Sequence, residues 1–180
     1  AACADRCGGQ ECLSGRVRAA GMRAMGAPAT FTRETIGFPG VSDATGGEIT
    51  EATERLAERY AGDPQVRVAF GPHAPYTCEP EFLRDIAERS SRTGIPVHTH
   101  VSESIAEIGD VETRFGATPG DHLAALGIVN DRLLAAHCVH LTAGEVARFG
   151  AAGAAVSHNP VSNLKLGNGV APFLELRAAG

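Results

Sequence analysis

The chain has 180 residues, a length that supports one domain with a hydrophobic core. Hydrophobic residues make up 43% of it and charged residues 21%, and the formal net charge of −5 excludes the basic face that nucleic-acid binding requires. Since no apolar run is long enough to cross a bilayer and no export leader opens the chain, we expect a cytoplasmic protein that contacts neither nucleic acid nor membrane.

Three cysteines lie near the start of the chain, at Cys3, Cys7 and Cys12. Their spacing misses the usual zinc pairs, and an iron–sulfur motif of the Cys-x3-Cys-x2-Cys type would need a cysteine where Gln10 stands. The total of five cysteines is odd, which argues against a disulfide framework in a cytoplasmic protein. We therefore interpret them as ordinary thiols.

Short apolar runs alternate with amphipathic stretches along the rest of the chain, which predicts repeated βα units and a parallel sheet. Strands are expected at about residues 22–31, 66–70, 95–101, 132–139 and 154–158. Helices are expected at about residues 45–60 and 80–93, in one or two segments up to 126, and from 142 and 172 onward. The polar residues 159–169 are expected to form a loop.

Particular residues mark the ends of these elements. Residues 45–48 and 142–145 both have the spacing of a capping box at a helix start. Pro80 suits the first turn of the second helix, and Gly94 suits its end. Pro28 leaves the course of the first strand open.

The number and spacing of these units predict the fold class. About five βα units in this length fit a (β/α)8 TIM barrel, which needs about 250 residues. We therefore predict an α/β fold in which residues 1–180 form the central part of a single barrel domain, roughly strands 3 to 7, with the first and last strands missing. An open doubly wound sheet is the alternative, but no Gly-x-Gly-x-x-Gly follows the first strand.

Six of the seven histidines lie on or directly after predicted strand ends, and only His122 falls on a helix. The six are His73, His98, His100, His137, His140 and His158. Because the carboxyl ends of parallel barrel strands meet at one mouth, we expect these side chains to converge. A single strand-end histidine is more often structural, but four separate strands that each carry one favour a functional site.

The segment from His98 to Glu103 has the pattern of a metal site. His98 and His100 are two residues apart on a strand, so both face the same side, where neutral imidazoles can bind zinc or iron. Glu103 comes just past the strand end, where a carboxylate can act as a proton shuttle. The alternative for Glu103 is an acid in the first turn of a helix, interacting with the helix dipole.

Other chemistries fit less well. The chain has no Gly-x-Ser-x-Gly motif and no Cys-x-x-Cys. Cys138 adjoins His137, but successive strand residues face opposite ways, so we interpret Cys138 as a packed thiol. Lys165 lies in the predicted polar loop and is expected to be solvated.

Four motifs occur in order: Gly71-Pro-His-Ala-Pro-Tyr-Thr77, His98-Thr-His-Val-Ser-Glu103, Ala136-His-Cys-Val139 and Ser157-His-Asn-Pro-Val-Ser-Asn-Leu-Lys-Leu-Gly167. Together they closely resemble the 5-methylthioadenosine/S-adenosylhomocysteine deaminase and triazine chlorohydrolase group of the amidohydrolase superfamily. The resemblance covers about residues 66–175, and residues 1–65 match only in general layout.

The resemblance implies a role for each matching residue. His100 corresponds to a metal ligand and Glu103 to the acid/base carboxylate that also contacts substrate. His137 corresponds to a catalytic histidine that holds the attacking water, or to a ligand in a two-metal member. His73 corresponds to a histidine that contacts the substrate.

The remaining residues of the motifs have supporting or open roles. His98 stands at a position that is not usually a ligand, so we expect it either to support the site or to have a structural role. For His158 and Asn163 we expect either an ordered loop or a pocket lining, and the two interpretations stay open. The family's metal site also takes a His-x-His pair from the first strand and an aspartate from the eighth, and neither is present, so these residues cannot complete a metal site.

The resemblance therefore implies a metal-dependent hydrolase with one divalent metal ion, zinc or alternatively iron. We expect hydrolytic deamination of a small-molecule substrate, an adenine-type nucleoside or a related aminated heterocycle, by the complete protein, with these residues alone inactive. One alternative is a chlorohydrolase or another C–N hydrolase on the same site, and another is a non-catalytic barrel fragment that binds a ligand or partner. A homo-oligomer stays open.

Overall fold

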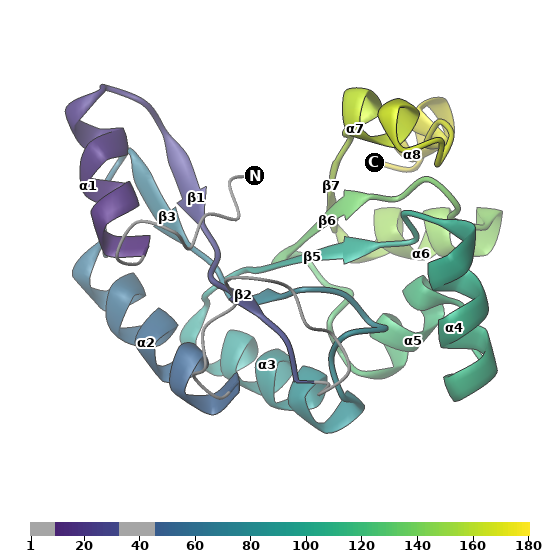
Figure 1. Cartoon of the computed structure of the whole chain (residues 1–180), viewed down its shortest axis with the longest axis horizontal. Helices are drawn as coiled ribbons and strands as arrows, with labels where there is room; N and C mark the ends of the chain where they lie inside the picture. Colours follow the sequence, from purple (N-terminus) through teal and green to yellow (C-terminus); the bar gives the residue numbers. More distant parts are fainter. Residues whose placement is uncertain (1–9, 33–45) are drawn as a thin grey trace.

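The computed structural model describes residues 10–32 and 46–180 of the chain (Figure 1). The strands in this part are β1 (Ala24–Gly26), β2 (Ala29–Thr30), β3 (Val66–Val68), β4 (Gly71–Pro72), β5 (Val97–Val101), β6 (Leu133–His137) and β7 (Ala155–Ser157). The helices are α1 (Gln10–Ala19), α2 (Gly46–Arg59), α3 (Pro80–Thr93), α4 (Ile105–Phe115), α5 (Pro119–Ala125), α6 (Ala143–Ala152), α7 (Pro160–Lys165) and α8 (Phe173–Ala179).

Every strand pair in this part of the chain is parallel. β1 pairs with β3, β2 with β4, and β5, β6 and β7 form a three-stranded sheet in that order. A bridge between Phe70 and Val97 connects the end of β3 to β5. In Figure 1 the strands form a curved inner layer, and α2, α3 and α5 lie on its outer side. The predicted α/β fold with a parallel sheet is confirmed.

The first predicted strand is divided into β1 and β2. Pro28 lies between them and has no N–H to donate to a neighbouring strand, which explains the interruption. The carbonyl group of Pro28 also lies very close to Gly71 in β4, so the two chain segments approach each other without an intervening side chain.

The helix ends follow local chemistry as predicted. Pro80 begins α3, and Gly94 ends it with a φ of 75°, a left-handed conformation that glycine adopts without strain. Thr142 and Glu145 form the predicted capping box of α6, each side chain accepting a hydrogen bond from the backbone N–H of the other. The predicted capping of α2 depends on Thr45, which lies outside the described residues.

Two helices differ from the sequence prediction. The helix α1, over residues 10–19, was not predicted, and Cys12 lies in it, while Cys3 and Cys7 lie outside the described residues. Residues 160–165 form the helix α7 within the segment predicted to be a loop. Pro160 at its first turn fixes φ for helix entry, whereas the serine and asparagine content of the segment favours a loop on propensity alone. Lys165 ends this helix and is exposed, as expected.

The hydrophobic core lies between the strand layer and the outer helices. Its largest fully buried apolar side chains include Phe70, Leu83, Ile86, Leu123, Ile128, Leu133 and Phe149. Burial of each such side chain contributes about 1.5 to 3 kcal/mol to folding. On β5 the side chains Val97, Thr99 and Val101 are buried, while His98 and His100 on the opposite face are only partly buried. The alternation therefore turns both histidines away from the core.

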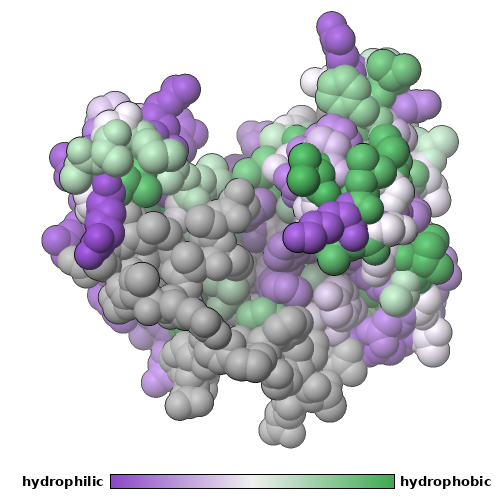
Figure 2. Space-filling view, turned by 45° about the horizontal axis from the view of Figure 1, so that its top comes forward, coloured by the Kyte–Doolittle hydropathy of each residue, from purple (hydrophilic) through white to green (hydrophobic). Residues whose placement is uncertain are grey.

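The surface of α7 and α8 is apolar. Figure 2 shows green side chains gathered on this part of the molecule, and the exposed large hydrophobic residues there are Val161, Leu164, Leu166, Val170, Phe173 and Leu174. Contiguous apolar surface of this kind is typical of a face that contacts other protein. A bilayer-spanning segment is not found among the helices of residues 10–32 and 46–180.

The close approach of residues 27–28 to β4 predicts that Gly71→Ala destabilises the protein. A Cβ atom at Gly71 would collide with the backbone of Ala27 and Pro28, and overpacking of this kind costs about 1 to 3 kcal/mol. Gly109→Ala is the matched control, because Gly109 lies in α4 with open space around its Cα, and alanine there gains up to about 1 kcal/mol of helix propensity. In urea unfolding, the midpoint of Gly71→Ala should be lower than that of wild type, and the midpoint of Gly109→Ala should be equal to it or higher. A midpoint of Gly71→Ala equal to that of wild type would contradict the proposed contact.

Candidate active site

Histidines from three neighbouring strands meet at the carboxyl ends of the sheet. His73 directly follows β4, His100 lies on β5 and His137 ends β6. The ring centroids of His73 and His100 are 4.7 Å apart, and those of His100 and His137 are 5.4 Å apart. Residues that are far apart in sequence therefore form one continuous row of imidazoles.

The carbonyl oxygen of His73 connects two of these strands. It accepts hydrogen bonds from the backbone N–H of His100 at 3.0 Å, from its ring Nδ1 at 2.6 Å, and from the hydroxyl of Thr99 at 3.2 Å. Because a carbonyl only accepts, Nδ1 of His100 carries the hydrogen and Nε2 carries the lone pair. The backbone end of one strand thus sets both the position and the tautomer of the imidazole on the next.

His98 and His137 are fixed in the same way. Nδ1 of His98 donates to the carbonyl oxygen of Leu134 at 2.9 Å, and Nδ1 of His137 donates to Oδ1 of Asn163 at 2.7 Å. Each ring therefore keeps its lone pair on Nε2. A hydrogen bond that fixes the other nitrogen is the usual arrangement of histidines that bind metal ions.

Burial favours the neutral form of His73, His98 and His100. Burial, with a smaller contribution from the neighbouring His100, lowers the pKa of His73 to about 4. Burial also lowers the pKa of His100 and of His98, although hydrogen bonds to backbone carbonyls partly oppose this. A neutral imidazole is the form that can bind a metal ion or accept a proton.

His73 lies in an aromatic environment. Its ring stacks on Phe31 with centroids 4.4 Å apart, and the ring of Tyr76 lies edge-on to it with a centroid distance of 6.1 Å. Nδ1 of His73 lies 3.0 Å from the hydroxyl oxygen of Thr77. These contacts hold the ring beside His100 at the mouth of the sheet.

Glu103 lies beside His137 just after β5. One carboxylate oxygen, Oε1, is 3.5 Å from Nδ1 of His137 and accepts a hydrogen bond from Nδ2 of Asn168 at 3.2 Å. The side chain is about one quarter exposed, with a relative accessible area of 23%, so solvent and small molecules can reach it. The structure therefore places an accessible carboxylate next to the imidazole row.

The backbone at the ends of β5 and β6 is left-handed at residues that are not glycine. Ser102 has a φ of 50°, His137 of 73° and Cys138 of 52°. Such conformations cost about 1 to 3 kcal/mol each and cluster at functional sites. The strain is offset by hydrogen bonds between the two strand ends, from the N–H of Cys138 to the carbonyl of Val101 at 2.9 Å and from the N–H of His140 to that of Ser102 at 3.0 Å.

Glu107 fixes the backbone that carries Glu103, and it was not identified from the sequence. Its buried carboxylate accepts the backbone N–H of Ser102 at 2.9 Å and of Glu103 at 2.8 Å. The spacing of Ser104 and Glu107 is that of a capping box, which was the available signal. Ser104 does cap α4, but Glu107 reaches past it to the strained turn.

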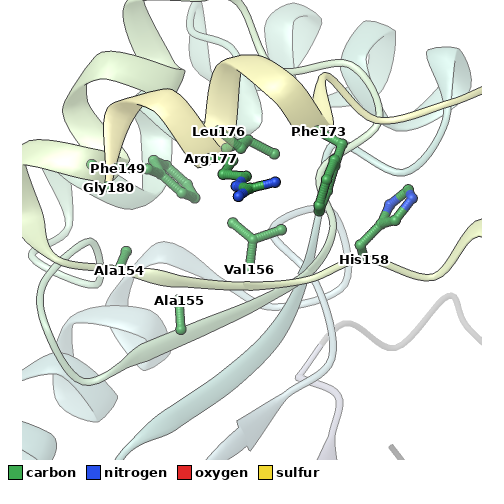
Figure 3. A pocket seen from close by; sticks show the side chains of 10 residues that line it. Phe149, Ala154, Ala155, Val156, His158, Phe173, Leu176, Arg177 and Gly180 are labelled. Atoms are coloured by element: carbon green, nitrogen blue, oxygen red, sulfur yellow. The ribbon is translucent and has the colours of Figure 1, made fainter.

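The other highlighted residues have different surroundings. Cys138 is fully buried and burial raises the pKa of its thiol, so the interpretation as a packed thiol is confirmed. His158 lies beside Phe173, with ring centroids 5.6 Å apart. Figure 3 shows His158 at one end of a mostly apolar pocket between β7 and α8, which also contains Val156 and Leu176. His73, His100 and His137 do not line this pocket.

The row of histidines offers part of a metal site. Within residues 10–32 and 46–180, no three His, Cys, Asp or Glu side chains are grouped so that they could hold an ion by themselves. Neutral imidazoles with Nδ1 hydrogen-bonded and a lone pair on Nε2, as in His100 and His137, are nevertheless the donors that zinc and iron prefer. The donors fit such a metal in kind, and a complete site requires further ligands.

Comparisons with known proteins agree on one family. Residues 14–180 match the family model described as the amidohydrolase family. A 5-methylthioadenosine/S-adenosylhomocysteine deaminase of Moorella thermoacetica is 41% identical over 145 residues, which are 80% of this chain and 34% of that protein. The chain thus spans about a third of the length of this curated relative.

Solved structures show the same similarity in three dimensions. An adenosine deaminase from Xanthomonas campestris with bound zinc matches with a TM-score of 0.85 and 31% identity, over 94% of this chain and 37% of that one. The atrazine chlorohydrolase TrzN from Arthrobacter aurescens TC1, complexed with zinc, matches with a TM-score of 0.84 and 25% identity, over 94% of this chain and 39% of that one.

The environment of Glu107 predicts a pH-dependent stability. Burial outweighs its backbone hydrogen bonds and raises its pKa from 4.5 to about 7. The unfolded carboxyl loses its proton first as pH rises, so ionisation favours the unfolded state and stability is lost from about pH 4.5 up to about pH 7. Between pH 5 and 8 the loss from this group is roughly 2 to 3 kcal/mol.

Comparison with Glu107→Gln isolates this contribution. Glutamine does not ionise, and its amide presents a donor where one backbone N–H needs an acceptor, so the variant should be less stable than wild type at pH 5. The free energies of unfolding, measured by urea denaturation, should converge as pH rises to 8. Parallel stability curves for the two proteins would show that Glu107 does not titrate as proposed.

Proposed function

Since the chain belongs to the amidohydrolase family, as its motifs predicted, we propose that the complete protein is a metal-dependent hydrolase of the deaminase type. The reaction joins an aminated ring carbon to the oxygen of water and releases ammonia. The observation that carries this proposal is the row of His73, His100 and His137 beside the carboxylate of Glu103. The 41% identity to a deaminase supports an adenine-type nucleoside as substrate.

The fold supports the same proposal at a finer level. The strand segments at residues 24–30, 66–72, 97–101, 133–137 and 155–157 would be five successive strands of a (β/α)8 barrel, numbered roughly 3 to 7 in the complete domain. In such a barrel the substrate binds at the carboxyl ends of the strands, where the histidines lie. A small molecule is the substrate class that this mouth would admit.

We assign the metal to His100 in this proposal. Its Nε2 carries the lone pair, and the His73 carbonyl fixes the ring orientation. Zinc is the first candidate and iron the alternative. A divalent ion bound there would supply a nucleophile by lowering the pKa of water toward neutrality.

Glu103 would move the protons of the reaction. Its carboxylate accepts a proton from the attacking water and delivers it to the ring nitrogen of the substrate, so it also contacts the substrate. The neighbouring Asn168 amide holds Oε1, and Oε2 accepts no hydrogen bond within the part of the chain that the structure describes. Glu103 is accessible enough to reach both partners.

His137 would bind and orient the attacking water, and His73 would contact the substrate. Nε2 of His137 has a lone pair, so it can accept a hydrogen bond from the attacking water and direct the water's oxygen at the substrate. His73 stays neutral at physiological pH, because its pKa is about 4. We propose it as a neutral contact to the substrate. His98, held to the Leu134 carbonyl, supports His100 from the same strand face.

Glu103→Gln tests the assigned proton carrier. The variant should lose about 10²- to 10⁴-fold in kcat, because glutamine cannot accept a proton. Its metal content, measured by atomic emission, should match wild type, because Glu103 is not assigned as a ligand. Glu112→Gln, an exposed position on α4, is the matched control and should keep full activity. Full activity of Glu103→Gln would refute the role.

The leaving group separates deamination from the chlorohydrolase alternative. Purified complete protein, assayed with aminated and chlorinated heterocycles, should release ammonia from an adenine-type nucleoside faster than chloride from a triazine. Chloride release with no ammonia would favour the chlorohydrolase. If neither product forms in zinc- or iron-loaded protein, the non-catalytic alternative is favoured.

A further inference from the structure

The α7 segment and the turn after it contact both the proposed proton carrier Glu103 and the proposed water-binding His137. Asn163 on α7 accepts a hydrogen bond from His137, and Asn168, in the turn after the helix, donates one to Glu103. The two asparagines are themselves connected, since the backbone N–H of Asn168 donates to the carbonyl of Asn163 at 2.8 Å. One short stretch of chain thus reaches the imidazole and the carboxylate together.

The asparagines hydrogen-bond Nδ1 of His137 and Oε1 of Glu103, the two atoms that would otherwise form a hydrogen bond with each other. Nδ1 of His137 lies 2.7 Å from Oδ1 of Asn163 and 3.5 Å from Oε1 of Glu103. The same Oε1 is the oxygen that Nδ2 of Asn168 holds at 3.2 Å. Nδ1 has one hydrogen to donate, so the shorter bond to Asn163 competes directly with a bond to Glu103.

A direct pair between His137 and Glu103 would be chemically costly for the proposed function. A hydrogen bond between an imidazole and a carboxylate is charge-assisted and stronger than one to a neutral amide. It would draw Oε1 toward His137 and turn the carboxylate away from the substrate. Hydrogen bonds to the two neutral amides instead hold each group separately, His137 through Asn163 and Glu103 through Asn168.

We propose that Asn163 and Asn168 are positioning residues that keep His137 and Glu103 apart, so that Glu103 faces the substrate. The inference rests on the proposed function of Glu103 and adds how its direction is set. Asn163 is fully buried, and its Nδ2 has no hydrogen-bond partner within residues 10–32 and 46–180. Within the same residues, the side chain of Asn163 forms its hydrogen bond through Oδ1, which accepts from Nδ1 of His137.

An isosteric substitution distinguishes this role from packing. Asn163→Leu keeps the side-chain size and removes both the acceptor and the unpartnered buried Nδ2, so a residue that only fills space would tolerate it. A residue that positions His137 through a hydrogen bond would not tolerate the substitution. We expect kcat of the complete, metal-loaded protein to fall at least 10-fold while KM changes less than about 3-fold, because the substrate contacts remain.

The ring N–H of His137 gives a readout that does not depend on activity. In proton NMR at fixed pH, the Nδ1–H resonance, assigned by its loss in His137→Gln, should move downfield in Asn163→Leu as the bond transfers to the Glu103 carboxylate. The shift should disappear in the double variant Asn163→Leu/Glu103→Gln. Asn168→Ala should produce a smaller shift in the same direction, because it frees Oε1 while Asn163 still holds the ring.

Leu164→Ala is the matched control, since Leu164 lies next to Asn163 on α7 and is 61% exposed. It should keep both the wild-type kcat and the wild-type Nδ1–H resonance. An unchanged resonance in Asn163→Leu would overturn the inference even in an active enzyme. The expected shift in a protein without deaminase activity would uphold the inference about geometry and reject the proposed function instead.

Discussion

The carbonyl oxygen of His73 is the atom on which the candidate site depends. It accepts three hydrogen bonds from Thr99 and His100, two of them from the backbone and ring of His100. These bonds join the end of β4 to β5, set the register of the strands at the mouth of the sheet and choose the tautomer of the imidazole. The parallel pairing of β5 with β6 then brings His137 beside His100. A parallel sheet therefore builds the site from backbone geometry, and the side chains supply the chemistry.

The site is held in place by groups that do no chemistry themselves. Glu107 offsets the left-handed backbone at Ser102, and hydrogen bonds between β5 and β6 offset that at His137. Burial lowers the pKa of His73 and of His100 and so favours their neutral forms. The left-handed backbone and the burial of the Glu107 carboxyl cost stability locally, and the buried core between the strands and the outer helices provides the compensation.

The sequence predicted the parallel α/β fold and the strand positions because hydrophobic periodicity, the glycines and prolines at element ends, and helix capping all act locally. Gly94 ends α3 and Thr142 caps α6 for reasons that a few neighbouring residues contain. It also predicted that His73, His100 and His137 converge, since this follows from strand ends alone. The helix α7 was missed because its serine and asparagine content favours a loop, and tertiary contacts such as the bond between Asn163 and His137 decide its form. Glu107 was missed because its role depends on a turn whose strain no pattern indicates.

The proposed chemistry depends on His100 as ligand of a metal ion that lies beside Glu103 and His137. The most direct test is an anomalous scattering measurement at the zinc edge on crystals of the complete zinc-loaded protein. If His100 is a ligand, a peak should lie about 2.0 to 2.1 Å from its Nε2, on the side that faces Glu103. A peak that His100 does not coordinate, or a fully loaded protein whose ion lies away from the strand ends, would contradict it.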